Sequence, residues 1–446
     1  MPAGGGNRLR ELRRAEGRPS ARAAWALAAL AGALLLAPAL ALAQAGADSL
    51  GARAATDTLG ARADSSGRAR AATDSLAAVA APESAVGGPI EDLWVLRNSL
   101  ERREDLPLLV ERARAMHVRR LLVQVVGRGD AWYRSDRLPY PEPLPEPGRD
   151  PLGELLPLAH AAGLEVHAWV NCCLVWSAPK RPRDPRHVVN AHPEWIARLK
   201  DGRSMARLSE GARRKLHVEG IFLSPANPGV RRWVAANAAE IARRYPVDGI
   251  HLDYIRQPGI DVGYDPTSRA RFALEHGVDP ARIGRLRGAD RATADSLWGE
   301  FQLEQVTAIV REVRDSLSAV RPGLPLSAAV LGDTLVAERR NRQAWLPWLR
   351  DGLLDRAYPM CYAPEVQTVL AQLEGLAPQP GAGRLVPGIA VYNTSPSIAA
   401  AKIKGALALG FRAIALYSYD SLWERDDQWS RLEEFLNGPR TLEVKP

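Results

Sequence analysis

The chain has 446 residues, of which 25% are charged and 46% hydrophobic, a balance typical of a globular protein with one large domain and extensions. The net charge is +8, but residues 1–43 hold six Arg against two Glu and contribute +4 of it. The rest of the charge is spread along the chain, and no basic run is interleaved with aromatic residues. This distribution argues against a nucleic-acid-binding protein.

Residues 1–43 have the pattern of a secretory signal peptide. An Arg-rich start precedes the apolar run 23–42, and small residues ending at Ala43 form a cleavage site before Gln44. An uncleaved membrane anchor is the alternative, but Pro38 interrupts the run and the small residues favour cleavage. We therefore expect an exported protein, periplasmic or extracellular, that is not attached to a membrane once the signal is removed.

Residues 44–89 form a segment of a different composition. They are rich in Ala, Gly, Asp, Ser and Arg, contain no aromatic residue, and repeat the strings LGARA and ATD. Such a segment cannot bury enough apolar surface to offset the entropy that ordering it would cost. We expect a disordered linker.

From about residue 90 onward, short β-rich runs alternate with helical patterns. The predicted strands cover residues 93–97, 120–126, 165–171, 249–254, 326–331, 356–362, 385–391 and 413–417. The predicted helices cover residues 102–116, 151–162, 229–244, 299–320, 342–352, 365–376, 396–409 and 429–437. This alternation predicts an α/β fold, a single (β/α)8 TIM barrel over residues 90–440. The alternative, a doubly wound open sheet, normally carries a Gly-rich phosphate turn after its first strand, and residues 98–101 contain no glycine.

The sequence contains only three cysteines, Cys172, Cys173 and Cys361. They form neither a disulfide framework nor a zinc pattern. At most one disulfide bridge is feasible, between Cys361 and either Cys172 or Cys173. We expect all three to be small buried apolar side chains near strand ends.

The stretch VDGIHLDYIR at 247–256 is the most informative for function. In a strand, Gly249, His251 and Asp253 share one face, and Asp253 comes last. A carboxylate at the end of a buried strand is costly unless it is hydrogen-bonded, coordinated or used in chemistry, and the active sites of β/α barrels lie at this end. Asp253 is therefore the first catalytic candidate; the alternative is a structural Asp that caps a loop or pairs with Arg256.

The other predicted strand ends carry amides, carboxylates and many aromatic residues, without a phosphate loop or a three-histidine set. Aromatic faces with hydrogen-bonding rims suit sugar rings, so we expect a polysaccharide or oligosaccharide as substrate and no cofactor or metal. His167, early in its strand, is expected to fill the barrel interior. The candidate substrate-binding residues are Arg128, Trp169, Asn171, His251, Tyr254, Tyr362, Tyr392 and Tyr417.

The chain also resembles a known family, the glycosyl-hydrolase-like 10 group of exported bacterial TIM-barrel proteins. The resemblance implies glycoside hydrolysis, with Asp253 as the acidic residue after the fourth strand, and for some members peptidoglycan glycan strands as substrate. Relatives carry Arg where this chain has Val126, and Gln where it has Met360. The matching strings are VQVVGRGDAWY (123–133), LEVHAWVN (164–171), HPEW (192–195), LSPANPGVRRWV (223–234), VDGIHLDY (247–254), YPMCY (358–362) and IALYSYDSLW (414–423).

Glycosidases usually use two carboxyl groups. The candidates for the second are Asp130, Asp333 and Glu365, in that order; Asp130 comes first because its string matches the family. The insert 172–222, rich in Arg and Lys, is expected to form a lid or cleft wall. We therefore expect a glycoside hydrolase acting on a cell-envelope polysaccharide.

Two other classes of protein remain alternatives. A non-catalytic carbohydrate-binding barrel would keep the aromatic residues and lose a carboxylate. A metal-dependent polysaccharide deacetylase would need His167, His251 and Asp253 to converge as ligands.

Overall fold

The computed structural model describes residues 89–142, 144, 146, 148–259, 261–424 and 427–437. The expected signal peptide and the expected linker up to residue 88 lie outside the described residues, so both stay predictions. Within the described part of the chain, no helix combines the length and the apolar character that crossing a membrane requires.

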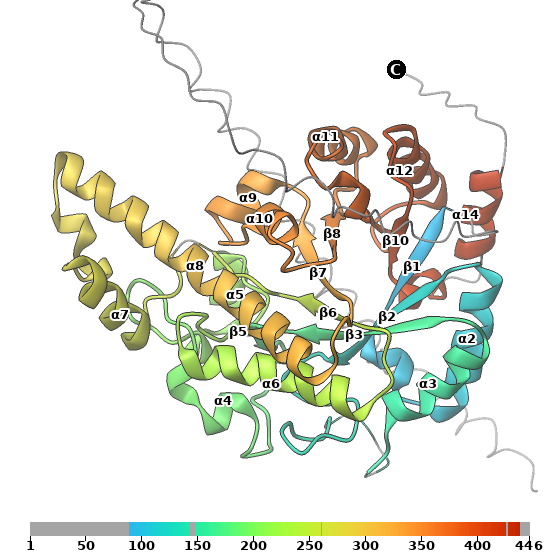
Figure 1. Cartoon of the computed structure of the whole chain (residues 1–446), viewed down its shortest axis with the longest axis horizontal. Coiled ribbons are helices and arrows are strands. Elements are labelled where there is room, and N and C mark those ends of the chain that lie inside the picture. The colour runs from blue at the N-terminus through green and yellow to red at the C-terminus, as the bar shows by residue number, and fades with distance from the viewer. Residues whose placement is uncertain are drawn as a thin grey trace, which may run out of the picture.

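Eight parallel strands close into a barrel, which confirms the predicted TIM-barrel fold (Figure 1). Strands follow one another around the barrel in chain order, and the first pairs with the last. The strands are β1 (Ile90–Val95), β2 (Arg120–Val126), β3 (Glu165–Asn171), β6 (Gly249–Asp253), β7 (Leu326–Leu331), β8 (Arg356–Cys361), β9 (Gly388–Ala390) and β10 (Ile414–Tyr417).

Helices surround the barrel on the outside, as Figure 1 shows. The helices that connect successive strands are α2 (Leu106–Ala115), α3 (Pro151–Ala161), α6 (Pro228–Arg244), α8 (Gly288–Val320), α10 (Trp345–Arg350), α11 (Val366–Leu376) and α12 (Pro396–Ala408), and α14 (Gln428–Asn437) follows the last strand. Shorter inserted elements are β4 (Leu174–Trp176), α4 (Val188–Ala191), α5 (Glu210–Leu216), β5 (Ile221–Phe222), α7 (Pro266–His276), α9 (Thr334–Arg339) and α13 (Tyr419–Leu422). Strands β4 and β5 pair antiparallel outside the barrel, within the basic insert.

Two helical stretches differ most from the predicted elements: α7 was not predicted, and α8 begins at Gly288 and not near residue 299. Its additional turns pack Ala294 and Trp298 against Phe272 of α7, in a small apolar cluster separate from the main core. Strand β9 is shorter than predicted and begins after Pro387, which has no N–H to donate to a neighbouring strand. The three cysteines are buried and unbonded, as expected.

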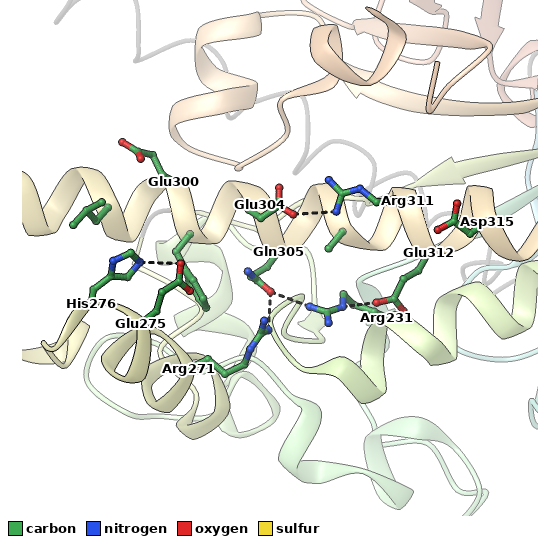
Figure 2. A pocket seen from close by; sticks show the side chains of 13 residues that line it. Arg231, Arg271, Glu275, His276, Glu300, Glu304, Gln305, Arg311, Glu312 and Asp315 are labelled. Atoms are coloured by element: carbon green, nitrogen blue, oxygen red, sulfur yellow. Dashed lines mark hydrogen bonds and ion pairs between the residues drawn. The ribbon is translucent and has the colours of Figure 1, made fainter. Parts of the chain in front are cut away.

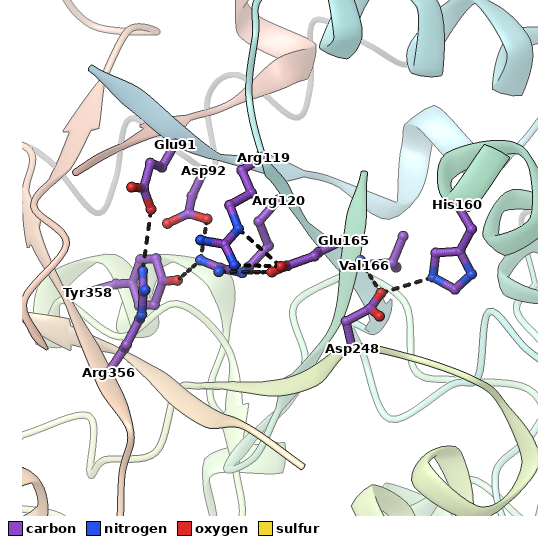
Figure 3. Close-up of polar contacts among 10 residues, drawn as sticks. All are labelled: Glu91, Asp92, Arg119, Arg120, His160, Glu165, Val166, Asp248, Arg356 and Tyr358. Carbon is purple, nitrogen blue, oxygen red and sulfur yellow. Dashed lines mark hydrogen bonds and ion pairs between the residues drawn. The ribbon is translucent and has the colours of Figure 1, made fainter. Parts of the chain in front are cut away.

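Ion pairs close the amino-terminal end of the barrel (Figure 3). The Arg120 guanidinium lies 2.7 Å from Asp92 and 2.9 Å from Glu165, and it also donates to the Tyr358 hydroxyl. Asp92 and Arg120 are only 0% and 4% exposed, so this pair is shielded from solvent. In β/α barrels this end serves stability, and chemistry belongs at the opposite end.

His167 and His251 fill the barrel interior between the two ends. The Trp94 indole N–H donates to His251 Nε2 at 3.1 Å, and His251 Nδ1 lies 2.9 Å from the Ser327 hydroxyl. Burial lowers the pKa of His251 to about 3, so its ring is neutral. The ring of His167 occupies the space that a side chain at Gly249 would fill, because a Cβ there would lie 2.3 Å from it. His167 is thus placed as expected.

Candidate active site

A cavity of about 310 Å³ opens at the carboxyl ends of the barrel strands. The insert 172–222 supplies four of its lining residues, which include Ser177 and Glu219, and therefore forms part of the cavity wall. The predicted site residues that line the cavity are Asp253, Trp169, Asn171, Tyr254, Tyr362, Tyr392 and Tyr417.

A larger cavity, of about 610 Å³, lies between α6, α7 and α8 on the outside of the barrel (Figure 2). Four of its charged side chains form ion pairs with each other: Arg231 pairs with Glu312 at 2.7 Å, and Arg311 pairs with Glu304 at 3.0 Å. None of the predicted site residues lines it. We therefore assign the functional site to the smaller cavity at the strand ends.

Asp253 ends β6 and lies in the cavity wall with only 7% of its surface exposed. Burial raises the pKa of its carboxyl group to about 6, although the N–H of Tyr254 and the charge of Arg256 both lower it. The Tyr254 N–H donates to Asp253 Oδ1 at 2.6 Å. Tyr254 itself has φ of 49°, a left-handed conformation that costs energy for a non-glycine residue and is typical of functional turns.

Glu219 is the only other carboxylate among the described residues that line this cavity. Its Oε1 accepts a hydrogen bond from Arg256 Nη2 at 2.5 Å, while Oε2 has no protein partner. Sequence reasoning missed Glu219, because it lies in the insert just before β5 and follows no strand-end or family motif. Its spacing from the end of α5 carried no signal that distinguishes it from a surface Glu.

Four aromatic rings gather on one side of the cavity at the ends of β3, β8, β9 and β10. The ring of Tyr417 lies 5.2 Å from that of Tyr362, 5.9 Å from that of Tyr392 and 6.4 Å from that of Trp169, between ring centres. Burial raises the pKa of Tyr392 to about 12 and that of the other two tyrosines further, so their hydroxyls stay protonated. Among the described residues, no hydrogen bond engages these three hydroxyls, and they are available to a ligand.

Arg97 and Asn171 complete the polar part of the cavity wall. The Arg97 guanidinium donates to Gln124 Oε1 at 2.6 Å and passes over Gly127, where a Cβ would lie 2.7 Å from Arg97 Nη1. Asn171 accepts from the Trp169 indole N–H at 2.9 Å and donates to the Gly127 carbonyl at 2.8 Å. The Asn171 amide therefore fixes the orientation of the Trp169 ring.

The other predicted site residues do not line the cavity. Asp130 lies in the loop after β2 and accepts from the Arg128 backbone N–H, while the Arg128 side chain donates to the hydroxyl of Ser177. Asp333 caps α9 by accepting from the Val336 N–H. Asp130 and Asp333 therefore stabilise a loop and the start of a helix. Asp suits catalysis and also makes a good cap, so the residue type alone did not separate these two roles. Outside the cavity lie Arg128, Asp130, His251, Asp333 and Glu365.

The alternative of a metal-dependent deacetylase finds no support in the geometry. Among the described residues, no three His, Cys, Asp or Glu side chains come together as ligands for a metal ion. Both ring nitrogens of His251 are engaged by Trp94 and Ser327, and His167 lies in the barrel interior.

Solved structures with a similar fold include two glycosidase domains. The glycoside hydrolase domain of PgaB (BpsB) from Bordetella bronchiseptica matches with a TM-score of 0.58 and 16% identity, over 78% of this chain and 99% of that domain. The catalytic domain of a β-amylase from Paenibacillus polymyxa matches with a TM-score of 0.52 and 12% identity, over 79% and 99%. At such low identity, these similarities establish the fold alone.

Sequence relatives point to one family. The chain is 26% identical to the glycosyl hydrolase DigH of Escherichia coli K12 over 308 residues, which are 60% of this chain and 61% of that protein. It is 20% identical to the glycosyl hydrolase YngK of Bacillus subtilis over 292 residues, 59% of this chain and 49% of that protein. The match thus spans less than two thirds of either relative. The sequence model of the family described as "Glycosyl hydrolase-like 10" matches residues 94–396, and the chain therefore belongs to the glycosyl hydrolase-like 10 family.

Proposed function

We propose that this protein is a glycoside hydrolase that cleaves a bacterial cell-envelope polysaccharide, with Asp253 and Glu219 as its two catalytic carboxyl groups. The observation that carries the proposal is a buried Asp253, with a pKa near 6, in one aromatic-lined cavity with the ion pair of Glu219 and Arg256. Peptidoglycan glycan strands are the first substrate to test, because the family resemblance implies them for some members and the sequence predicts export.

In the proposed reaction, Asp253 is the general acid. A carboxyl group with a pKa near 6 is still protonated in an appreciable fraction of molecules near neutral pH, and it can donate that proton to the oxygen of the leaving sugar. The low-dielectric, water-poor cavity wall favours the protonated form of the Asp253 carboxyl group, because burial stabilises the neutral acid.

Glu219 is the proposed partner carboxylate. Arg256 binds one of its oxygens, and the second oxygen, Oε2, is buried without a protein partner. A negative charge held in this way stabilises the oxocarbenium-like transition state of glycoside cleavage and can accept a proton from the attacking water. Trp169, Tyr362 and Tyr417 offer ring faces for the apolar C–H surfaces of the sugar.

The test is incubation of the mature protein with purified peptidoglycan sacculi and a panel of oligosaccharides, followed by mass analysis for new reducing ends. Asp253→Asn keeps the volume of the side chain and removes the acid, so we expect turnover to fall by at least about 10²-fold while sugar binding persists. Asp333→Asn is the matched control, because Asn caps a helix as well as Asp and residue 333 lies outside the cavity.

Two results would contradict the proposal. Near-normal turnover of Asp253→Asn would remove Asp253 from the reaction. Binding of sugars without new reducing ends, in the wild type as well, would favour a non-catalytic carbohydrate-binding barrel.

A further inference from the structure

Asp420 lies next to the candidate active site without lining its cavity. It belongs to α13, three residues after Tyr417, and its carboxylate contacts the chain that leaves β1. Asp420 Oδ2 accepts a hydrogen bond from the Leu96 N–H at 2.9 Å, and Oδ1 accepts one from the Ser99 hydroxyl at 2.7 Å. These contacts exist because β10 pairs with β1 where the barrel closes, so the segments that follow the two strands are neighbours (Figure 1).

The two hydrogen bonds to Asp420 bracket Arg97 and Asn98, which both line the cavity. Residues Arg97–Leu100 form one turn of 3-10 helix, and no side chain of the preceding residue caps this turn. Within the turn, the Ser99 N–H donates to the Leu96 carbonyl at 3.0 Å. A single 3-10 turn has poor hydrogen-bond geometry and little stability of its own. Its position therefore depends on the side chain of Asp420.

The Asp420 carboxylate is suited to this role by its charge. Burial raises the pKa of Asp420 to about 6, although the hydrogen bonds from Ser99 and Leu96 lower it. The group is therefore mostly ionised near neutral pH, and hydrogen bonds to an ionised acceptor are stronger than those between neutral groups. The charge of Asp420 also favours the charged form of Arg97, as the charge of Asp130 does.

We propose that Asp420 is a positioning residue of the candidate active site, which holds the turn 96–99 so that Arg97 and Asn98 face the substrate. The inference rests on the proposed function and adds to it a residue that acts from outside the cavity. The Arg97 guanidinium donates to Gln124 Oε1 at 2.6 Å, and a displaced turn would move it out of this contact. Small displacements of groups that position a substrate are costly for the rate of reaction.

A double-mutant cycle tests whether Asp420 acts through Arg97. Asp420→Ala removes both acceptors, so kcat/KM for peptidoglycan glycan strands should fall by about tenfold. Arg97→Gln should lower it as well, and the double variant should be no worse than Arg97→Gln alone, because the turn then has no guanidinium left to position. Ser99→Ala removes only one of the two hydrogen bonds. It should give a smaller loss that also disappears in the Arg97→Gln background, and it carries the test if Asp420→Ala does not fold.

A measurement without any sugar tests the placement of Arg97 itself. Phenylglyoxal modifies arginine side chains, and mass spectrometry of the digested protein gives the rate at which Arg97 is modified. This rate should rise several-fold in Asp420→Ala, since the guanidinium is released from Gln124. Ser418→Ala is the matched control, because Ser418 caps the same helix by accepting from the Ser421 N–H and makes no hydrogen bond to the turn 96–99.

Three results would overturn the inference: an unchanged modification rate of Arg97 in Asp420→Ala, losses of kcat/KM that multiply in the double variant, or equal effects of Ser418→Ala. A wild type that cleaves no glycan would instead reject the proposed hydrolysis, and the modification rate of Arg97 would still decide whether Asp420 positions it.

Discussion

The carboxyl group of Asp253 is governed by its burial at the end of β6. Burial raises its pKa to about 6, so the neutral form is favoured in the folded state relative to the unfolded chain. The stabilisation that this provides is fully present below the ordinary pKa of an Asp and is lost as the pH rises through about 6. Above that pH, the folded protein holds an ionised carboxylate with little access to water.

Asp253→Asn should therefore stabilise the protein at pH 8 and leave its stability nearly unchanged at pH 4. The upper limit of the gain is about 3 kcal/mol, the free energy that corresponds to the shift in pKa. Thermal melts of both proteins between pH 4 and pH 8 measure it. A lower melting temperature of the variant at pH 8 would instead identify Asp253 as a structural cap.

Glu219 and Arg256 form the second residue-scale feature of the cavity. Glu219→Gln keeps the shape of the side chain and removes the charge, so we expect turnover to fall by about 10²-fold with a smaller change in KM. Glu210→Gln is a suitable comparison, because Glu210 also pairs with an arginine, Arg214, but does so on the surface of α5 outside the cavity. Equal activity of the two variants would exclude Glu219 from the reaction.

At the scale of elements, the strands were predictable where burial made the hydrophobic runs continuous. The bounds of β2, β3 and β7 agree with the sequence prediction, since nearly every residue in them is buried. The start of α8 was missed because residues 288–298 contain mostly Ala and charged residues with no regular apolar stripe; Trp298 and Ala294 acquire a partner only when α7 folds against them.

The candidate site was predictable only where the fold alone determines position. Asp253, Trp169 and the three tyrosines Tyr362, Tyr392 and Tyr417 line the cavity because strand ends meet there. Glu219 could not be predicted, since its place depends on how the 51 residues of the insert fold back over the barrel through β4 and β5. His251 was expected in the site because it shares a strand face with Asp253. It comes two residues earlier on the strand, however, and therefore lies below the cavity.

Breaking the ion pairs at the amino-terminal end of the barrel should lower the stability of the protein and leave its turnover unchanged. Asp92→Ala leaves the buried Arg120 with only Glu165 as a carboxylate partner, and breaking a buried pair costs about 3–5 kcal/mol. Denaturant unfolding measures this cost. Folded protein should keep its turnover, because this end lies opposite the cavity. Glu104→Ala is the control, since its pair with Arg102 is exposed and its loss should hardly change the free energy of unfolding.

At the scale of the whole molecule, the first and last strands close the barrel. Strand β1 pairs with β10 on one side and with β2 on the other, so the described amino-terminal strand is held between the two ends of the domain. The barrel therefore forms only when the chain up to β10 is available, and the strand ends that carry Tyr417 and Asp253 are brought to one cavity by that closure.

The uneven charge of the molecule predicts that the rate of substrate association depends on salt concentration. The segment 172–222 carries +6, and charges at the surface lose their long-range attraction once the Debye length falls from about 10 Å at 0.1 M salt to about 3 Å at 1 M. Peptidoglycan glycan strands freed of peptides carry a lactyl carboxylate on every second sugar, and chitin oligosaccharides have the same linkage without carboxylates. Association of the glycan strands with the protein should therefore slow several-fold between these two salt concentrations, whereas association of the chitin oligosaccharides should not. Stopped-flow fluorescence of the cavity tryptophan and tyrosines measures both rates. Replacement of Lys180 and Lys215, two exposed lysines of this segment, by Gln should reduce the salt dependence, because fewer surface charges would attract the strand. An equal salt dependence for both substrates would show that the insert has no part in attracting the polymer.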